Sequence, residues 1–428
     1  MSLLSSLYTG TTGLEANTQD LSIIGDNIAN ANTIGFKGSR AAFEDQLSQQ
    51  LLGAGQVGLG AKLQMSQRIF TQGSLTSTGI STDLALEGAG LFAVKGTHNG
   101  VTGTFFTRDG KFQQDKDGFL SNLGGLRVQG YQADATGTIT GQLGDLAIGG
   151  QQSNPKASDT VTLKANLRAD APVLAAAWDP LTPGPTSNFS TGVTVYDSLG
   201  ATHQMSVYFR KTADGAWDWH GLVNGGEVQG GTKGVQSEVA SGTLSFDSAG
   251  ALSAFTQTSS FNPNGAVNPQ PLAFNFGDPT SVAGGTGLAG IRQTTSDSAV
   301  TFTSQNGYTS GQLAGMRIDA SGNITGAFTN GQTRVLGQVA VASFSAPDRL
   351  DRAAGNLLAE TANSGTASFG AAGTGGRGSV SGGALEQSNV DLATEFVRMI
   401  SAQRGFQANS KTINTADQLL QELIQLKR

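Results

Sequence analysis

Hydrophobic residues at the two ends of the chain recur every seven positions, and this repeat predicts a helix at each end. The N-terminal series is Leu7, Leu14, Leu21 and Ile28, and the C-terminal series is Leu392, Met399, Phe406, Ile413 and Leu420. All prolines, which break helix interiors, lie between Pro155 and Pro347, so both ends are free to be helical. A repeat of seven is typical of a helix that packs along a partner helix. We therefore expect the two ends to form a coiled-coil-like pair.

The C-terminal segment also predicts how its helix begins and how closely a partner approaches. Ser388 and Asp391 form a capping-box-like start. Small residues accompany the seven-residue series, among them Ala402, Asn409 and Ala416, and would let another helix come close. The residues expected to carry self-assembly are the two series together with Phe396 and Leu423.

Glycine-rich stretches separate both predicted helices from the rest of the chain. The range 365–383 contains eight glycines, and Gly53, Gly55, Gly58 and Gly60 follow the N-terminal segment. Stretches of this composition are typical of flexible connectors. Ordinary core packing is the alternative interpretation of the helical spacing, but it requires a body on which the helices lie. We therefore expect other copies of the chain to cover the surface of the helix pair.

The pattern between the ends indicates β-strands. Short apolar runs such as "GLFAVKG" and "VLGQVAVASF" are separated by Asp-Gly or Asn-Gly dipeptides, which favour tight hairpins. Proline-bearing stretches at 151–185 and 263–290 suggest the limits of a middle domain. We expect a mainly β fold with two nested antiparallel β domains, sandwich- or barrel-like, plus the helical pair. The predicted divisions are a helical domain (1–30 and 385–428), a connector (31–75 and 366–384), an inner β domain (76–150 and 301–365) and an outer β domain (151–300).

Composition narrows the functional class. Charged residues are 14% of the chain, the net charge is −6 and the pI is about 5.1, so a basic footprint for nucleic acid is absent. Cysteine is absent, and no run of 18 apolar residues suggests membrane insertion. The first basic residue is Lys37, whereas a cleavable signal peptide begins with a basic region. If the chain is exported, we expect a route that does not use a cleavable signal peptide.

Candidate catalytic and metal motifs are weak. "GTGLAG" at 285–290 matches a dinucleotide-binding pattern but precedes an extended stretch rather than a helix. "DKDGF" at 115–119 lacks the later ligands of a calcium loop and favours a hairpin turn. His98, His203 and His220 lack the spacing of a zinc site, and Trp217 and Trp219 favour packing on one strand face. We predict no catalytic, cofactor-binding or metal-binding residues.

Two long motifs resemble the rod and hook axial proteins of the bacterial flagellum. The first is the N-x-A-N-x-x-T-x-G-F-K signature, matched by Asn27, Ala29, Asn30, Thr33, Gly35, Phe36 and Lys37. The second runs from Gly383 to Leu423 and includes Ser388, Asn389, Val390, Asp391, Gln403 and Arg404. The stretch "GVTVYDSLGATHQMSVYFRKTADGAWDW" at 192–219 looks like the outer domain of flagellar hook proteins, and "QNGYTSGQL" at 305–313 like their return strand.

This resemblance implies a layered structural subunit and no enzyme. Hook subunits form a curved hollow helical tube that acts as a universal joint and transmits torque from rod to filament. Their terminal helices line the inner tube, and they leave the cell through the flagellar type III export apparatus without a cleaved signal. The implied partners are further copies of the chain, rod and hook–filament junction proteins, and the hook cap, with no nucleic acid. The implied location is the extracellular hook.

Two other functional classes remain as alternatives. A distal rod subunit would be a straight, rigid drive shaft built with the same terminal helices, but its middle region is shorter. A secreted β-rich enzyme or adhesin with helical tails would require a site in the middle domain, where the sequence presents none.

Overall fold

The computed structural model describes residues 3–47 and 58–426 and divides into two compact units. Unit 1 comprises Met1–Gly150, Ala314–Ala327 and Thr333–Arg428. Unit 2 comprises Gln151–Leu313 and Phe328–Gln332. The fold is mainly β, with one long helix at each end of the chain, as the sequence pattern predicts.

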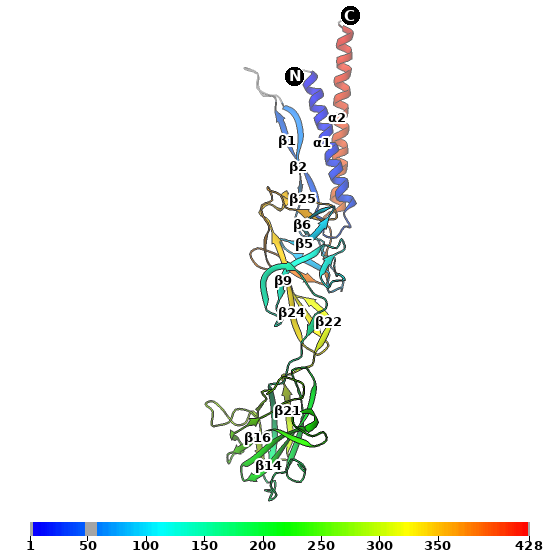
Figure 1. Cartoon of the computed structure of the whole chain (residues 1–428). Helices are drawn as coiled ribbons and strands as arrows, with labels where there is room; N and C mark the ends of the chain where they lie inside the picture. Colours follow the sequence, from blue (N-terminus) through cyan, green and yellow to red (C-terminus); the bar gives the residue numbers. More distant parts are fainter. Residues whose placement is uncertain (1–2, 48–57, 427–428) are drawn as a thin grey trace. The chain divides into compact units, whose positions relative to one another are not determined.

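The terminal helices are α1 (Leu3–Ala29) and α2 (Leu392–Leu426), which lie side by side in unit 1 (Figure 1). They are antiparallel, because Gly10 lies beside Ile413 whereas Asn17 lies beside Gly405. At a rise of 1.5 Å per residue, the 35 residues of α2 span about 52 Å. The predicted pairing of the two ends is confirmed. Within the described residues, no helix has the length and apolar character needed to cross a membrane.

A β-hairpin follows α1 and lies along it. Its strands are β1 (Ser39–Leu47) and β2 (Gly58–Arg68), which pair antiparallel. The Thr12 hydroxyl of α1 donates to the Leu59 carbonyl of β2 at 3.2 Å. The predicted connector glycines Gly53 and Gly55 lie outside the described residues.

The β body of unit 1 is built around a mostly antiparallel sheet in the order β22-β23-β24-β9-β5-β6-β26-β25. Leu91, Ala93, Phe106 and Ala342 form part of its core. The strands are β3 (Leu75–Ser77), β4 (Leu84–Glu87), β5 (Leu91–His98), β6 (Val101–Thr107), β7 (Phe112–Gln114), β8 (Leu120–Asn122), β9 (Arg127–Ala133), β10 (Ile139–Asp145), β22 (Gly311–Ile318), β23 (Asn323–Phe328), β24 (Thr333–Ser343), β25 (Asp351–Arg352), β26 (Leu358–Ala359), β27 (Ser368–Ala371), β28 (Ser379–Gly382) and β29 (Ala384–Glu386), with a 3-10 turn at Pro347–Arg349. β22 begins in unit 2 and continues into unit 1.

The glycine-rich range 365–383 is organised by strand pairing. β27 pairs with β24, β28 pairs with β4, and the following strand β29 pairs with β3. Gly373, Gly375 and Gly376 have φ angles of 74°, 57° and 78° in the turn between β27 and β28. These glycines therefore supply left-handed turn conformations between paired strands.

Unit 2 encloses its own core, in which both Trp217 and Trp219 are fully buried, as the period-two spacing predicts. One sheet has the order β13-β14-β15-β16-β17, and a second centres on β12. The strands are β11 (Gln152–Ser153), β12 (Thr160–Arg168), β13 (Phe189–Tyr196), β14 (Thr202–Ala213), β15 (Ala216–Asn224), β16 (Gln236–Phe246), β17 (Leu252–Phe255), β18 (Thr258–Ser259), β19 (Ala273–Asn275), β20 (Arg292–Thr294) and β21 (Ala299–Gln305), with a 3-10 turn at Gly225–Glu227. The expectation of purely antiparallel sheets needs correction, because β12 pairs in parallel with β19 and β20. Long connections in unit 2 permit this arrangement, whereas hairpins cannot.

Several predicted turns join neighbouring strands. Asn99-Gly100 connects β5 to β6, with φ angles of 49° and 79°, which only glycine and asparagine adopt readily. Asp214-Gly215 joins β14 to β15, and Asn330-Gly331 joins β23 to β24. The "DKDGF" motif joins β7 to β8, where the Asp115 carboxylate accepts the N–H groups of Asp117 and Phe119. The hairpin interpretation of that motif is confirmed.

Candidate assembly site

The contact between α1 and α2 is built on small residues that let the two backbones approach closely. A Cβ atom added at Gly10 would lie 2.7 Å from Cγ1 of Ile413, and one added at Gly13 would lie 2.5 Å from Nδ2 of Asn409. Both distances are too short for a side chain to fit without movement. On α2, the predicted small residues Ala402 and Ala416 are both buried. Glycine at these α1 positions therefore allows the pairing, although it lowers intrinsic helix stability.

Charged residues interact where the second half of α1 lies beside the start of α2. Nη2 of Arg398 lies 3.9 Å from the Asp20 carboxylate, and Nη1 of the same guanidinium donates to the Glu395 carboxylate at 3.0 Å. Burial raises the pKa of Asp20, and the Arg398 charge opposes this effect. The helix pair thus holds a partly buried charge group in addition to its small-residue contact.

The predicted self-assembly residues are not the ones that bury most deeply within one chain. Leu7, Leu14, Leu21 and Ile28 are only partly buried in α1, as are Met399, Ile413 and Leu420 in α2. Ala16, Ile24 and Asn27 are buried instead. The Leu423 side chain lies outside the described part of the chain. A strict spacing of seven misses the buried positions because α1 packs against both α2 and the β1–β2 hairpin.

Part of α2 presents an exposed apolar stripe, which we define as Leu392, Phe396 and Ile400. Their side chains are 43%, 50% and 51% exposed. Residues four apart lie on one face of a helix, so the three form a continuous surface. At 100° per residue, this face is turned away from Ala402 and Ala416, which pack toward α1. Phe406 is also exposed, but it lies four residues after Ala402 and therefore outside the stripe. Such a surface is available to a partner helix.

Two glycine substitutions provide a matched test of the helix contact. Nothing lies within 4 Å of a Cβ added at Gly25, so Gly25→Ala should stabilise α1 by about 0.5–1 kcal/mol. Gly10→Ala makes the same chemical change but collides with Ile413, so we expect no gain or a loss. Hydrogen exchange of α1 amides in the full chain measures both effects. Equal stabilisation by the two variants would contradict the close contact at Gly10.

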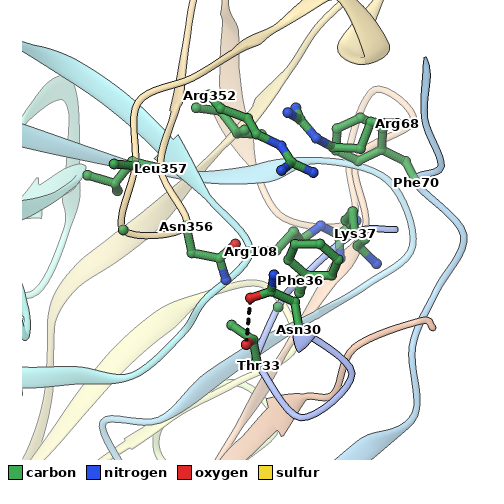
Figure 2. Close-up of a pocket in the computed structure, with 14 residues that line it drawn as sticks. Asn30, Thr33, Phe36, Lys37, Arg68, Phe70, Arg108, Arg352, Asn356 and Leu357 are labelled. Carbon is green, nitrogen blue, oxygen red and sulfur yellow. Dashed lines mark hydrogen bonds between the residues drawn. The ribbon is translucent and has the colours of Figure 1, made fainter. Parts of the chain in front are cut away.

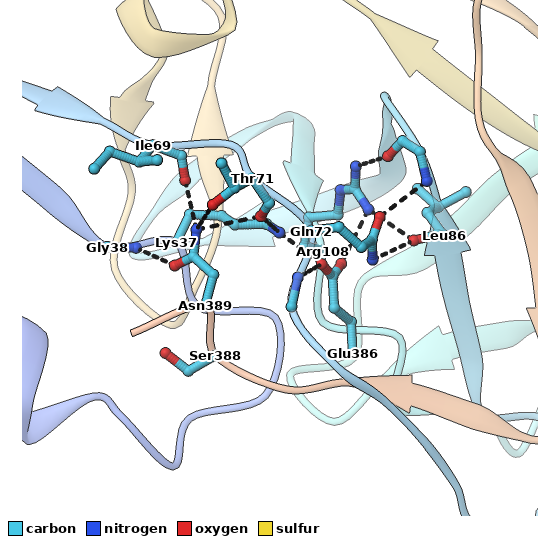
Figure 3. A network of polar contacts seen from close by, with 12 residues as sticks. Lys37, Gly38, Ile69, Thr71, Gln72, Leu86, Arg108, Glu386, Ser388 and Asn389 are labelled. Atoms are coloured by element: carbon cyan, nitrogen blue, oxygen red, sulfur yellow. Dashed lines mark hydrogen bonds and ion pairs between the residues drawn. The ribbon is translucent and has the colours of Figure 1, made fainter. Parts of the chain in front are cut away.

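Beside the helix pair, a buried charge cluster joins three distant parts of the sequence. Nζ of Lys37 donates to Oε1 of Glu386 at 2.6 Å, and Nη1 of Arg108 donates to Oε2 of the same carboxylate at 2.9 Å (Figure 3). The Glu386 side chain has no solvent exposure, and those of the two cations are 3% exposed. The N–H of Gly73 also donates to Oε1, at 2.8 Å. The carboxylate is thus fully engaged, as a buried charge requires.

Backbone carbonyls accept further hydrogen bonds from the two cations, whereas Nε of Arg108 is buried without an acceptor among the described residues. Lys37 donates to the Thr71 carbonyl at 2.7 Å, and Arg108 donates to the carbonyls of Leu86 and Gly88. Burial lowers the pKa of Lys37 and that of Arg108, while Glu386 opposes the shift in both. The cluster therefore fastens strand β29 to the turn after α1 and to the loop after β6.

The N-terminal signature residues form the turn that leads into this cluster. Asn27 exchanges hydrogen bonds with the backbone of Ser39, at 2.7 and 2.8 Å. The Thr33 hydroxyl donates to Oδ1 of Asn30 at 3.0 Å. Gly35 has a φ of 68°, and a Cβ there would lie 2.5 Å from the backbone of Arg108. Phe36 is buried, whereas Ala29 is exposed.

The C-terminal signature residues hold the start of α2 against the same turn. Oδ1 of Asn389 accepts the Gly38 N–H at 2.8 Å, and its Nδ2 donates to the Ile69 carbonyl at 2.9 Å. Val390 is partly buried next to Gly38. Figure 3 shows Asn389 close to Lys37 and Thr71. Both signatures therefore meet in one place, although they lie at opposite ends of the sequence.

The predicted capping box is corrected by the structure. Asp391 caps α2, because its carboxylate accepts the Thr394 N–H at 2.9 Å and its carbonyl accepts that of Glu395. Ser388 instead accepts the Val390 N–H at 3.3 Å, before the helix begins. Gln403 and Arg404 are exposed on α2. Sequence reasoning missed Glu386 and Arg108, since only the fold brings them beside Lys37.

Four models of known protein families together match most of the chain. Residues 7–37 match the flagella basal body rod protein family, and residues 381–426 match the flagellar basal body rod FlgEFG protein C-terminal family. Residues 85–165 match the flagellar hook protein FlgE/F/G D1 domain, and residues 162–308 match the flagellar basal body protein FlaE D2 domain. The two signature regions thus fall within the first two matches.

Curated relatives match over their full length. The chain is 34% identical to the flagellar hook protein FlgE of Treponema pallidum, with 100% of both chains covered. It is 33% identical to the flagellar hook protein FlgE of Escherichia coli, covering 97% of this chain and 98% of the relative. The crystal structure of Helicobacter pylori flagellar hook protein FlgE2 aligns at 16% identity with a TM-score of 0.47, covering 71% of this chain and 98% of that one.

Proposed function

Because the chain belongs to the flagellar hook protein family, we propose that it is a structural subunit of the bacterial flagellar hook. Many copies assemble into a curved hollow helical tube. This tube acts as a universal joint that transmits torque from the rod to the filament. The full-length matches to hook proteins favour this function over that of a distal rod subunit.

The observation that carries the proposal is the exposed apolar stripe of Leu392, Phe396 and Ile400 on α2. Because each of these side chains is about half exposed, burying the rest in an assembly is worth roughly 0.7–1.5 kcal/mol per side chain. Partial exposure of the two seven-residue series adds apolar surface on the same helix pair. We therefore assign self-assembly to the stripe and the two series, with Phe406 among them.

We propose that successive segments of the chain form nested layers of the hollow tube. The helical layer is 1–30 and 385–428, the next layer is 31–75 with 366–384, and the β layers are 76–150 with 301–365 and 151–300. Two observations support this order: the chain forms two compact units, and the sequence of unit 2 is inserted within that of unit 1. In the assembled hook, the helical layer lines the central channel.

We also propose partners and an export route for the subunit, which its membership of the family supports. The subunit contacts further copies of itself, the rod, the hook–filament junction proteins and the hook cap. It reaches the extracellular hook through the flagellar type III export apparatus. Its role is structural, and it carries no catalytic activity.

Electron microscopy of two chains tests the proposed function. The first is the full chain, and the second is a shortened chain of residues 30–391. The shortened chain omits α1 and α2 but keeps β28, β29 and Glu386, which complete the β body. We expect the full chain to form curved tubes with a narrow channel, and the shortened chain to stay folded and monomeric.

Other results in the electron micrographs would support the rod function or contradict the proposal. Straight and stiff tubes would support the rod function, because a drive shaft must not bend. Tubes formed by the shortened chain would show that the terminal helices are dispensable for assembly, contrary to the proposal. A full chain that stays monomeric over a wide range of salt and protein concentration would also count against it.

A further inference from the structure

A cavity of about 200 Å³ lies in unit 1 between the turn after α1 and the loop that joins β25 to β26. Its apolar walls include Phe36 and Phe70. Four cationic side chains also line it: Lys37, Arg68, Arg108 and Arg352. No carboxylate is found among the described residues of its lining. The guanidinium groups of Arg68 and Arg352 lie near one another, with Arg352 over the Phe36 ring and Arg68 over the Phe70 ring (Figure 2).

These four cations contact only two carboxylates within the described residues. Lys37 and Arg108 share Glu386, and Nη1 of Arg352 pairs with the Asp26 carboxylate at 2.6 Å. In the part of the chain that the structure describes, no carboxylate lies within ion-pair distance of Arg68. The cavity therefore has more positive charge than its neighbours neutralise.

Arg68 is poorly satisfied in this position. Its Nη1 reaches only the Leu350 carbonyl, at 3.4 Å. Burial, together with the charge of Arg352, lowers the pKa of Arg68 to about 10, while Asp351 opposes the shift. A partly buried guanidinium beside a like charge is unfavourable unless an anion joins it.

The loop that joins β25 to β26 lines the cavity and contains residues in a strained backbone conformation. Ala354, Gly355 and Asn356 have φ angles of 62°, 61° and 62°. The left-handed conformation is unfavourable for alanine, because its Cβ approaches the following carbonyl oxygen. Strain of this kind tends to occur where a binding site must be held in shape. The strained loop and the unpaired cation thus line the same cavity.

We propose that this cavity binds a single oxyanion between the guanidinium groups of Arg68 and Arg352. A carboxylate or a phosphate group matches the paired N–H donors of a guanidinium and removes the repulsion between the two arginines. Two sources supply this chemistry. One is the carboxylate of an acidic side chain from a second copy of the chain, which rests on the proposed function. The other is free phosphate.

The first measurement uses inorganic phosphate and the full chain kept below its assembly concentration. Thermal unfolding is followed at constant ionic strength, with chloride replaced by phosphate. At about ten times its Kd, phosphate should raise the Tm of unit 1 by on the order of 2–4 °C. Arg68→Gln should lose this shift. Arg40→Gln is the matched control, because Arg40 is exposed on β1 and its loss changes the net charge equally.

The Tm of Arg68→Gln without phosphate also shows whether Arg68 serves to bind an anion or to stabilise the fold. Removing an unneutralised cation should leave the Tm without phosphate unchanged or higher, whereas removing a structural arginine would lower it. General stabilisation by phosphate acts on every variant alike. Equal Tm shifts in the native chain, Arg68→Gln and Arg40→Gln would therefore overturn the proposal.

Assembly measurements then distinguish the two sources. If the anion is a carboxylate of a second copy, Arg68→Gln should raise the concentration needed for assembly about tenfold, and phosphate should inhibit assembly of the native chain. If the anion is free phosphate, it should raise the Tm without inhibiting assembly. A native chain that never assembles would contradict the proposed function, while the Tm measurement on the monomer still decides whether the cavity binds an oxyanion.

Discussion

Phe396→Asp is expected to abolish assembly of the full chain while leaving both units folded. The Phe396 ring lies in the middle of the exposed stripe on α2 and is half exposed in the single chain. Losing the burial of its exposed half costs roughly 0.7–1.5 kcal/mol, and placing a carboxylate in an apolar contact adds roughly 2 kcal/mol or more. A loss of about 3 kcal/mol raises the concentration needed for assembly more than 100-fold. Sedimentation and electron microscopy measure the change.

Ser401→Asp is the matched control for this substitution. Ser401 is exposed on the same helix, and the variant gains the same charge, but its position lies about 140° from Phe396 around the helix axis. We expect Ser401→Asp to reduce assembly far less. Circular dichroism of both monomers checks that the helices and the β units are intact. Native-like tubes formed by Phe396→Asp would rule out the stripe as an assembly surface.

Glu386→Gln is expected to destabilise unit 1 by about 3–5 kcal/mol, since it leaves two buried cations without their carboxylate. The loss is large because the Lys37 and Arg108 side chains are each only 3% exposed. Thermal and denaturant unfolding of the full chain measures it. Unit 2 has a separate core, so its transition should stay in place.

Glu87→Gln provides the control for the loss of one glutamate charge in unit 1. Glu87 lies on β4 and is exposed, so its replacement should change stability by less than about 0.5 kcal/mol. A Glu386→Gln variant as stable as Glu87→Gln would show that the charge cluster does not hold the β body together. Lys37→Met combined with Glu386→Gln should recover part of the loss, because one fewer buried cation is then left unpaired.

Many local features of this protein follow from short-range sequence patterns. Proline-free ends with apolar residues at helical spacing become α1 and α2, since a helix depends on contacts between residues three or four apart. Dipeptides such as Asn99-Gly100 become tight turns because their backbone preference is intrinsic. The two signatures also indicated the family without reference to any contact.

Interactions between distant residues depend on the tertiary structure. Lys37 and Glu386 are 349 positions apart, and no periodic pattern links them. The same holds for the meeting of Gly10 with Ile413, and for the cavity that sets Arg68 against Arg352. Sequence spacing reports which face of a helix or strand a residue occupies, whereas the partner of that face is decided by packing. Short-range patterns were thus enough to predict the terminal helices, the tight turns and the family, whereas long-range packing creates the buried charge cluster, the small-residue helix contact and the cationic cavity.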